Sequence, residues 1–176
     1  MTNTVKLLRE LIALPSVNPA FLSAADPHAG EQRVAEYLAA CAAKAGLDIE
    51  FQPASAKRSN LLARLTPAGE TRQRVVLAPH MDTVGGAELP GQLFTPRIKQ
   101  GRLFGRGACD TKGSVAVMLT ALAELARSRQ RPTHTEILLA ALVDEECGQI
   151  GSRALAATGW EAGLAIVGEP TGLQVV

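Results

Sequence analysis

One histidine and several acidic side chains stand where short apolar runs of the sequence end. Residues 75–77 are apolar and largely β-branched, as in a strand covered on both faces, and Pro79 marks where strand pairing stops. His80 and Asp82 follow, and in extended backbone their side chains point the same way. Asp82 can then accept a hydrogen bond from one ring nitrogen of His80 while the other nitrogen faces a metal ion. On this spacing alone, a loop histidine beside a solvated aspartate is the better interpretation.

Further carboxylates occupy similar positions elsewhere in the chain, and they reverse that preference. Residues 135–143 are mostly apolar and are followed directly by three adjacent acids, Asp144, Glu145 and Glu146. A shorter apolar run, residues 164–167, is followed by Glu169, and Asp110 lies just ahead of a helix expected over residues 115–129. Three adjacent carboxylates repel one another, so they need a cation or a solvated loop.

The elements that must position these side chains alternate between helices and strands. Periodicity and helix-stop residues predict helices at residues 5–12, 31–45, 115–129 and 152–158. Short apolar runs predict strands at residues 47–51, 60–65, 75–77, 135–143 and 164–167. This order indicates an α/β fold, a three-layer sandwich in which helices cover both faces of a central, largely parallel (mixed) sheet.

The sequence also allows predictions for two connections between these elements. Lys57 and Arg58 lie between two strand candidates, and we interpret them as solvated turn charges rather than a binding patch. Residues 85–104 contain several Gly and Pro residues without a periodicity of their own, which is typical of a functional or mobile connection.

In a sheet of this kind, ligands bind beyond the carboxyl ends of the strands. We therefore expect His80, Glu145, Glu146 and Glu169 to gather there, with Asp110 nearby. One imidazole with several carboxylates is a donor set suited to a catalytic zinc, cobalt or manganese ion. Each residue also has a structural interpretation, since Asp110 suits a helix cap and the glutamates suit a solvated turn or surface. Four such coincidences at element ends favour the metal site.

The composition of the chain argues against several other classes of function. The chain has 176 residues, of which 47% are hydrophobic and 20% charged, as in one globular domain. A formal net charge of +1 gives no electrostatic case for nucleic acid or an anionic membrane, so a small-molecule substrate is favoured. The three cysteines suggest neither a disulfide framework nor a zinc knuckle, and no secretory signal or membrane-spanning run is present. We expect a cytoplasmic protein.

Four elements of the sequence resemble those of a known family, the zinc-dependent hydrolases that include acetylornithine deacetylase, succinyl-diaminopimelate desuccinylase, aminoacylase and carboxypeptidase G. His-Met-Asp-Thr-Val at residues 80–84 resembles the family's His-x-Asp-x-Val element. The others are similar to residues 105–113, to Glu-Glu-Cys-Gly at residues 145–148, and to Gly-Glu-Pro-Thr at residues 168–171. The resemblance covers nearly the whole chain and is specific for the family but weakly specific for substrate.

The resemblance implies a role for each site residue. His80 would bind metal and Asp82 would orient it, while Asp110 would bridge two divalent ions, zinc or alternatively cobalt or manganese. The peptide bond after Asp110 would be cis. Glu145 would act as general base, and Glu146 and Glu169 would be further metal ligands.

The same resemblance implies an amide hydrolase for an N-acyl amino acid, of the deacetylase or desuccinylase type. A dipeptidase or carboxypeptidase of the same family is the alternative, and a metal-binding but inactive module is the alternative from a different class. Retention of Glu145, which would not bind metal, counts against the inactive module.

Length is the main departure from the family. Relatives are usually longer, with an inserted lid through which they form homodimers and a last histidine ligand near the C-terminus. Residues 1–176 would therefore be the N-terminal portion of the catalytic domain, without the lid or the C-terminal catalytic segment. We expect this chain by itself to be catalytically silent or nearly so.

Overall fold

A mixed five-stranded sheet forms the middle layer of the structure, with the strand order β1-β2-β6-β3-β7. The computed structural model describes residues 3–23, 25–85, 91–129 and 131–172. The sheet consists of β1 (Asp48–Ser55), β2 (Arg58–Leu65), β3 (Gln73–Ala78), β6 (Thr135–Ala141) and β7 (Leu164–Val167). β1 and β2 form an antiparallel hairpin and β2 runs antiparallel to β6, whereas β3 runs parallel to both β6 and β7. The predicted mixed sheet is confirmed. Several of the acids expected at the site follow β6 and β7, which belong to its parallel part.

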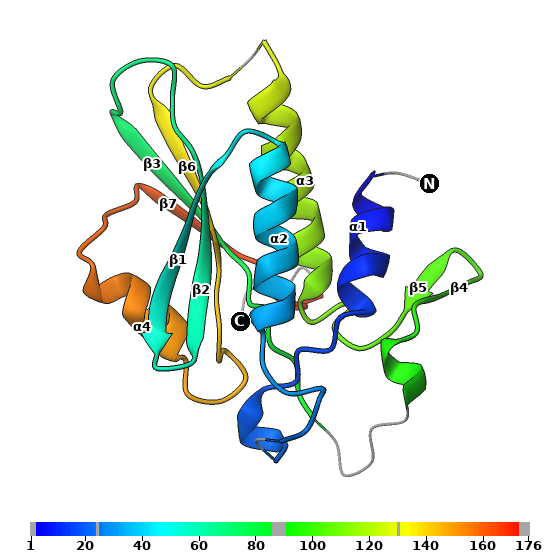
Figure 1. Ribbon diagram of the computed structural model, residues 1–176. Helices are drawn as coiled ribbons and strands as arrows, with labels where there is room; N and C mark the ends of the chain where they lie inside the picture. The colour runs from blue at the N-terminus through cyan, green and yellow to red at the C-terminus, as the bar shows by residue number, and fades with distance from the viewer. Residues whose placement is uncertain (1–2, 24, 86–90, 130, 173–176) are drawn as a thin grey trace.

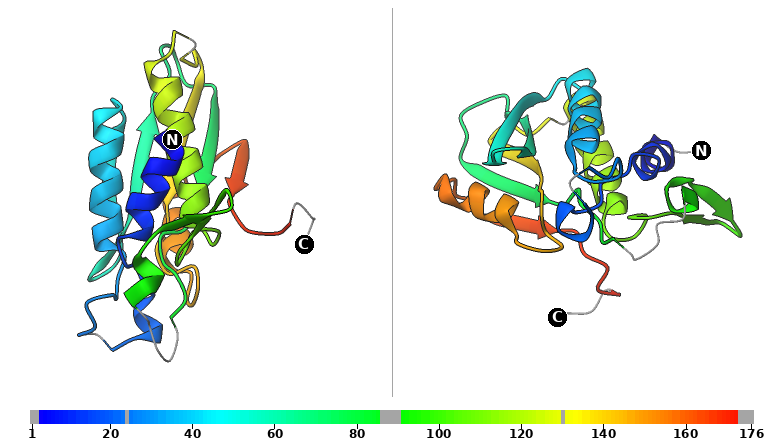
Figure 2. Two further views of the ribbon diagram at one scale, coloured as in Figure 1. Left: turned by 90° about the vertical axis from the view of Figure 1, so that its right-hand side faces the viewer. Right: turned by 60° about the horizontal axis from the view of Figure 1, so that its bottom comes forward.

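Helices cover both faces of this sheet, which confirms the predicted three-layer sandwich (Figures 1 and 2). α2 (Gln32–Lys44) and α3 (Lys112–Arg127) lie on one face, and α1 (Asn3–Ile12) packs against α3. α4 (Ile150–Ala157) lies on the opposite face. No helix in the described ranges is both long enough and apolar enough to cross a bilayer.

The alternation of side chains along β2 and β6 explains why both faces need cover. Successive residues of a strand point to opposite faces, so a strand that is apolar throughout must be buried on both. The α2 and α3 face receives Leu61, Ala63, Leu65, Leu139 and Ala141. The α4 face receives Leu62, Leu138 and Ala140 together with Leu155 and Trp160. The sheet therefore has two apolar cores, and its middle strands are fixed between them.

The strand β1 runs further than the sequence predicted, because it continues through Pro53 to Ser55. Proline cannot donate to a ladder, so it is tolerated where one side of the strand has no partner. β1 is an edge strand, and the register shifts by a bulge between Pro53 and Ser55. The opposite edge is β7, all four residues of which are exposed.

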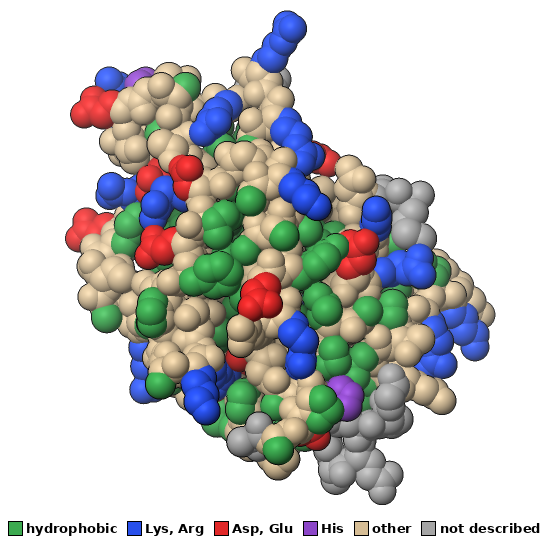
Figure 3. Space-filling view, viewed as in Figure 1, with side chains coloured by type: hydrophobic (Ala, Val, Ile, Leu, Met, Phe, Trp, Pro, Cys, Tyr) green, Lys and Arg blue, Asp and Glu red, His purple; other side chains and the backbone are tan. Residues whose placement is uncertain are grey.

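A second, two-stranded sheet lies in the connection that shows no periodicity in the sequence and that we expected to be functional or mobile. It pairs β4 (Arg97–Lys99) with β5 (Arg102–Phe104), and a short 3-10 helix, η2 (Gly91–Phe94), precedes it. Another 3-10 helix, η1 (Pro19–Phe21), lies in the N-terminal loop. The hairpin stands apart from the main sheet, and basic side chains gather over it in Figure 3. Strands of three residues are too short to show periodicity in the sequence, so this hairpin was missed.

A buried lysine fastens α1 to the start of α3. Lys112 is fully buried, and its Nζ donates hydrogen bonds to the carbonyl oxygens of Leu11 at 2.9 Å and Leu14 at 2.7 Å. These carbonyls lie at the end of α1, where a helix leaves its last C=O groups without internal partners. Burial, with a smaller contribution from the charge of Arg33, lowers the pKa of Lys112 to about 7. A neutral amine has two N–H groups, so it can make both hydrogen bonds without a buried charge.

We expect the stability of the fold to rise between pH 7 and pH 9 because of Lys112. Its pKa is lower in the folded chain than its ordinary value of 10.5, so the unfolded chain binds more protons over this range. Lys112 alone should increase the free energy of unfolding by about 2 kcal/mol over this range. Urea denaturation at the two pH values measures the change. Lys112→Met should remove the rise, whereas the exposed Lys44→Met should keep it; an identical pH dependence in all three proteins would contradict the prediction.

Candidate metal centre

The carboxyl ends of the parallel strands bring the predicted residues to one edge of the sheet. His80 follows β3 after Pro79 and forms an isolated parallel bridge with Leu142, which follows β6. Glu145 and Glu146 come next along that loop, and Glu169 follows β7. Because β3 runs parallel to β6 and β7, all three strands end at the same side.

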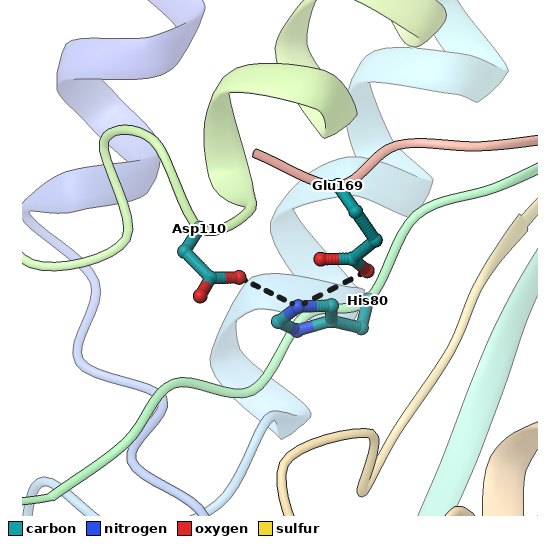
Figure 4. Close-up of side chains that lie close together, drawn as sticks. All are labelled: His80, Asp110 and Glu169. Atoms are coloured by element: carbon teal, nitrogen blue, oxygen red, sulfur yellow. Dashed lines mark hydrogen bonds and ion pairs between the residues drawn. The ribbon is translucent and has the colours of Figure 1, made fainter. Parts of the chain in front are cut away.

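His80 lies at the centre of the site and is 1% exposed. Its Nδ1 lies 2.9 Å from the main-chain oxygen of Asp82. A carbonyl oxygen can only accept, so Nδ1 carries the proton and Nε2 is left free to bind a ligand in the neutral ring. That Nε2 faces Asp110 Oδ1 at 3.1 Å and Glu169 Oε1 at 3.7 Å (Figure 4). It also lies 3.7 Å from Glu145 Oε2.

Three predicted ligands come together as a group. One donor atom from each of His80, Asp110 and Glu169 lies within 4.8 Å of the other two. Asp110 immediately precedes the turn into α3, and the Asp110–Thr111 peptide bond is cis, as the resemblance implied. The Thr111 hydroxyl donates a hydrogen bond to the carbonyl oxygen of Gly168, so the segment that carries Asp110 is joined to the segment that carries Glu169.

The carboxylate of Asp82 has contacts beyond the one with His80 that we expected. It lies 3.5 Å from His80 Nδ1, further than the main-chain oxygen of the same residue. Its two oxygens instead accept hydrogen bonds from the backbone N–H groups of Glu145 at 3.0 Å and Glu146 at 3.1 Å. The amide of Asn18 donates a third hydrogen bond at 2.7 Å. Asp82 thus orients the histidine mainly through its backbone and fixes the glutamate loop through its side chain.

Glu146 lies outside the group of three, but its surroundings suit a ligand. Its Oε1 is buried and has no hydrogen-bond partner among the described residues. Burial raises the pKa of Glu146, and the negative charge of Asp110 raises it further. A buried carboxylate oxygen without a donor is costly unless a cation or proton satisfies it. The unpartnered oxygen of Glu146, with the charge of Asp110 acting on it, is therefore suited to bind a cation.

The charges around His80 compete with its burial. Burial disfavours the imidazolium, but the hydrogen bond and charge of Asp82 and the charges of Glu169 and Glu145 outweigh it and raise the pKa of His80 to about 9. Burial also raises the pKa of Glu169, and the charges of Glu145 and Asp110 add to that effect although His80 opposes it. These pKa shifts favour a proton on the His80 ring and disfavour charge on Glu146 and Glu169.

Asp144, the first of the three adjacent acids, faces away from this site. Its carboxylate accepts hydrogen bonds from Arg58 Nη1 at 2.8 Å, from Asn18 Nδ2 at 2.9 Å and from the N–H of Gly148 at 3.1 Å. Arg58 also pairs with the buried Glu31. The expectation that Arg58 is a solvated turn charge is wrong, because it lies in β2 and its side chain is only 16% exposed. Arg58 thus supplies a cation for the first of the three adjacent carboxylates.

The donor set fits a divalent metal ion. One neutral imidazole nitrogen and several carboxylate oxygens suit zinc, cobalt or manganese, and no thiolate takes part. The raised pKa values and the buried oxygen of Glu146 are what such a site shows when its cation is taken away.

Three residues that support the site were not singled out from the sequence: Asn18, Arg58 and Thr111. Each acts through a hydrogen bond to a residue far away in the chain. Asn18 lies 126 positions from Asp144 and Thr111 lies 57 from Gly168. No local pattern marks such partners, so short-range periodicity could not reveal them.

Comparisons with known proteins agree with this geometry. The model of peptidase family M20/M25/M40 matches residues 76–176, which contain all six predicted site residues. The succinyl-diaminopimelate desuccinylase of Variovorax paradoxus is 35% identical over 185 aligned residues, which cover 99% of this chain and 45% of that protein. The acetylornithine deacetylase of Proteus mirabilis is 36% identical over 179 residues, with coverages of 98% and 43%. The chain thus spans less than half the length of these relatives.

A solved structure shows the same fold. The M20 family metallo-carboxypeptidase from Sulfolobus solfataricus superposes with a TM-score of 0.70 over 96% of this chain and 37% of the other. The sequence identity is 18%, so this likeness concerns the architecture alone.

We expect the affinity of the site for metal to rise with pH up to about 9. A ligand histidine must lose its proton before it binds, and the pKa of His80 is raised to about 9. Zinc affinity should increase about tenfold from pH 7 to pH 8, with release of about one proton per ion. Calorimetry in buffers of different ionisation enthalpy measures both quantities.

A second histidine provides the control for this prediction. His28 also lies beside a carboxylate, with its Nδ1 2.9 Å from Asp26 Oδ1, but it is not part of the site. His28→Gln should keep the proton release, and His80→Gln should abolish both the release and tight binding. Zinc binding that does not depend on pH or buffer would contradict the role given to His80.

Proposed function

The chain belongs to peptidase family M20/M25/M40, and on that basis we propose that it carries the metal-binding and proton-transfer residues of a hydrolase that cleaves amide bonds in N-acyl amino acids. One observation carries the proposal: the free Nε2 of His80 faces Asp110, Glu169 and Glu145 at the carboxyl ends of the parallel strands. The names of the desuccinylase and deacetylase relatives support an acetyl or succinyl group as the acyl part.

The metal ligands have separate roles in this proposal. His80, Asp110 and Glu169 would hold one divalent ion, and Asp110 and Glu146 would contribute to a second. Zinc is the ion that we favour, with cobalt and manganese as alternatives. When bound, such ions polarise the scissile carbonyl and make water more acidic.

Glu145 is the proton carrier of the proposed reaction. Its carboxylate is 39% exposed and lies 3.7 Å from His80 Nε2, so it borders the metal position and still reaches solvent. It takes a proton from the attacking water as the water oxygen bonds to the carbonyl carbon. It then delivers that proton to the amide nitrogen as the C–N bond breaks, which releases an amine and a carboxylic acid, and the acid's proton passes to the amine to give a carboxylate and an ammonium ion.

Asp82 keeps Glu145 in place for these transfers. Its carboxylate is fully buried and accepts the backbone N–H groups of Glu145 and Glu146, which fixes the loop without touching either glutamate side chain. The side chains of both glutamates are thus free for the proton and the metal.

A peptidase is the second candidate, since the structure with the same fold from Sulfolobus solfataricus is described as a metallo-carboxypeptidase. A dipeptide or a C-terminal residue presents the same amide bond to the same groups.

We place the reaction in the cytoplasm, because the cysteines Cys41, Cys109 and Cys147 are free and a reducing compartment keeps them so.

Two glutamine variants distinguish proton transfer from metal binding. Glu145→Gln keeps the shape of the side chain but cannot take up a proton, so in an intact version that includes the expected lid and C-terminal catalytic segment, turnover of N-acetyl and N-succinyl amino acids should fall by about 100- to 10,000-fold. Its zinc content should stay near that of the unchanged protein. Glu146→Gln should instead lower zinc affinity by at least about tenfold, since a site short of a ligand binds weakly.

Metal analysis after dialysis and assays of acyl amino acids and dipeptides measure these effects. Equal loss of zinc in both variants would refute the division of roles. Faster release of amino acids from dipeptides than from acyl amino acids would favour the peptidase.

A further inference from the structure

A single asparagine side chain joins the two acidic residues that hold the glutamate loop. Asn18 is fully buried, and its Nδ2 donates to Asp82 Oδ2 at 2.7 Å and to Asp144 Oδ1 at 2.9 Å. Its Oδ1 accepts from the N–H of Ala20 at 3.0 Å, which fixes the orientation of the amide. An amide NH₂ group has two hydrogens, so both donors of Asn18 are used.

The two acids that Asn18 joins fix opposite ends of one turn. Asp82 accepts the backbone N–H groups of Glu145 and Glu146, and the Oδ2 of Asp144 accepts those of Gly148 at 3.1 Å and Ile150 at 3.4 Å. Residues 145–150 are therefore held at their start by one carboxylate and at their end by the other. Asn18 bridges these two carboxylates.

The backbone leaves Asn18 little freedom. Its N–H donates to the carbonyl of Thr83 at 2.9 Å, and the N–H of Thr83 donates to the carbonyl of Ser16 at 3.0 Å. The Ser16 hydroxyl donates to the carbonyl of Met81 at 2.7 Å. The N-terminal segment thus runs along the residues that follow His80 and brings a neutral donor between two negative side chains.

Charge explains why an amide is suited to this position. Asp82, Asp144 and Glu31 are all buried, and Arg58 contacts two of them, Glu31 and Asp144. Asp82 has no arginine beside it, and its carboxylate depends on the two backbone N–H groups, on Asn18 and, at 3.5 Å, on the ring of His80. A carboxylate at position 18 would remove both donors and add a further negative charge to the cluster.

We propose that Asn18 is a positioning residue of this site, which acts through Asp82 and Asp144 to direct Glu145 toward His80 and Glu146 toward the metal position beside Asp110. The inference rests on the proposed function, because it concerns the same glutamates. Asn18 itself touches no proposed metal ligand through its side chain.

Asn18→Asp tests the proposal, with Asn60→Asp as a matched control. Asn60 is equally buried, and its amide donates to Gln52 Oε1 and to the carbonyl of Gly151, both at 2.8 Å. It contacts neither Asp82 nor Asp144. Both substitutions should lower the thermal stability to a similar extent, so a difference between them reports on the site rather than on the fold.

Three measurements on the chain follow the effect: zinc affinity, the absorption spectrum of the cobalt-loaded protein, and hydrogen exchange of the peptide that contains Glu145 and Glu146. Asn18→Asp should lower zinc affinity about 10- to 100-fold, the usual cost of losing a residue that supports a ligand. It should also change the cobalt spectrum and speed exchange at the two glutamates. Asn60→Asp should keep the affinity, the spectrum and the exchange at those glutamates near their original values.

Wild-type affinity and exchange in Asn18→Asp would overturn the proposal, and so would an equal loss of zinc in Asn60→Asp. If Asn18→Asp does not fold, Asn18→Ser retains one donor and should show the same changes in smaller measure; unchanged binding and exchange in it would also overturn the proposal. If the unchanged protein binds no metal, the proposed function fails, and hydrogen exchange at Glu145 and Glu146 still decides whether Asn18 fixes the loop.

Discussion

The need to satisfy one fully buried carboxylate, that of Asp82, shapes the site. A buried charge without partners costs several kcal/mol, so its oxygens must be supplied with donors. The donors come from two separate parts of the chain: Asn18 in the N-terminal loop, and the backbone of Glu145 and Glu146 after β6. Asp82, two positions after His80, therefore determines where Glu145 and Glu146 lie.

The three adjacent acids after β6 are divided between two environments. Asp144 has a φ of 65°, a left-handed conformation that aspartate tolerates better than most residues and that takes the chain out of the strand. Its carboxylate turns to Arg58, while Glu145 and Glu146 remain on the side of His80. One arginine thus neutralises the acid that supports the loop, and the other two are left for a metal ion and a proton.

The sequence allowed the layers of the fold and the members of the site to be predicted, because both depend on local patterns. Apolar runs marked β3, β6 and β7, and the chemistry-bearing residues followed directly after them or ahead of α3. Parallel strands then brought His80 and Glu169 together, as expected. What could not be predicted depends on pairing between distant residues. Arg58 resembled a turn residue until β2 placed it against Asp144, and the partners of Asp82 lie 63 and 64 positions away.

The separation in sequence between Asn18 and Asp144, 126 positions, bears on how the protein is made. Contacts between residues so far apart in the sequence form only after long loops have closed, so they come late in folding. On the ribosome, the helices α1 and α2 and the β1-β2 hairpin can begin to form while the remainder is still being synthesised. The ligand set has to wait until Glu169 has left the exit tunnel. Metal capture by this group during synthesis would thus come after most of this chain has emerged.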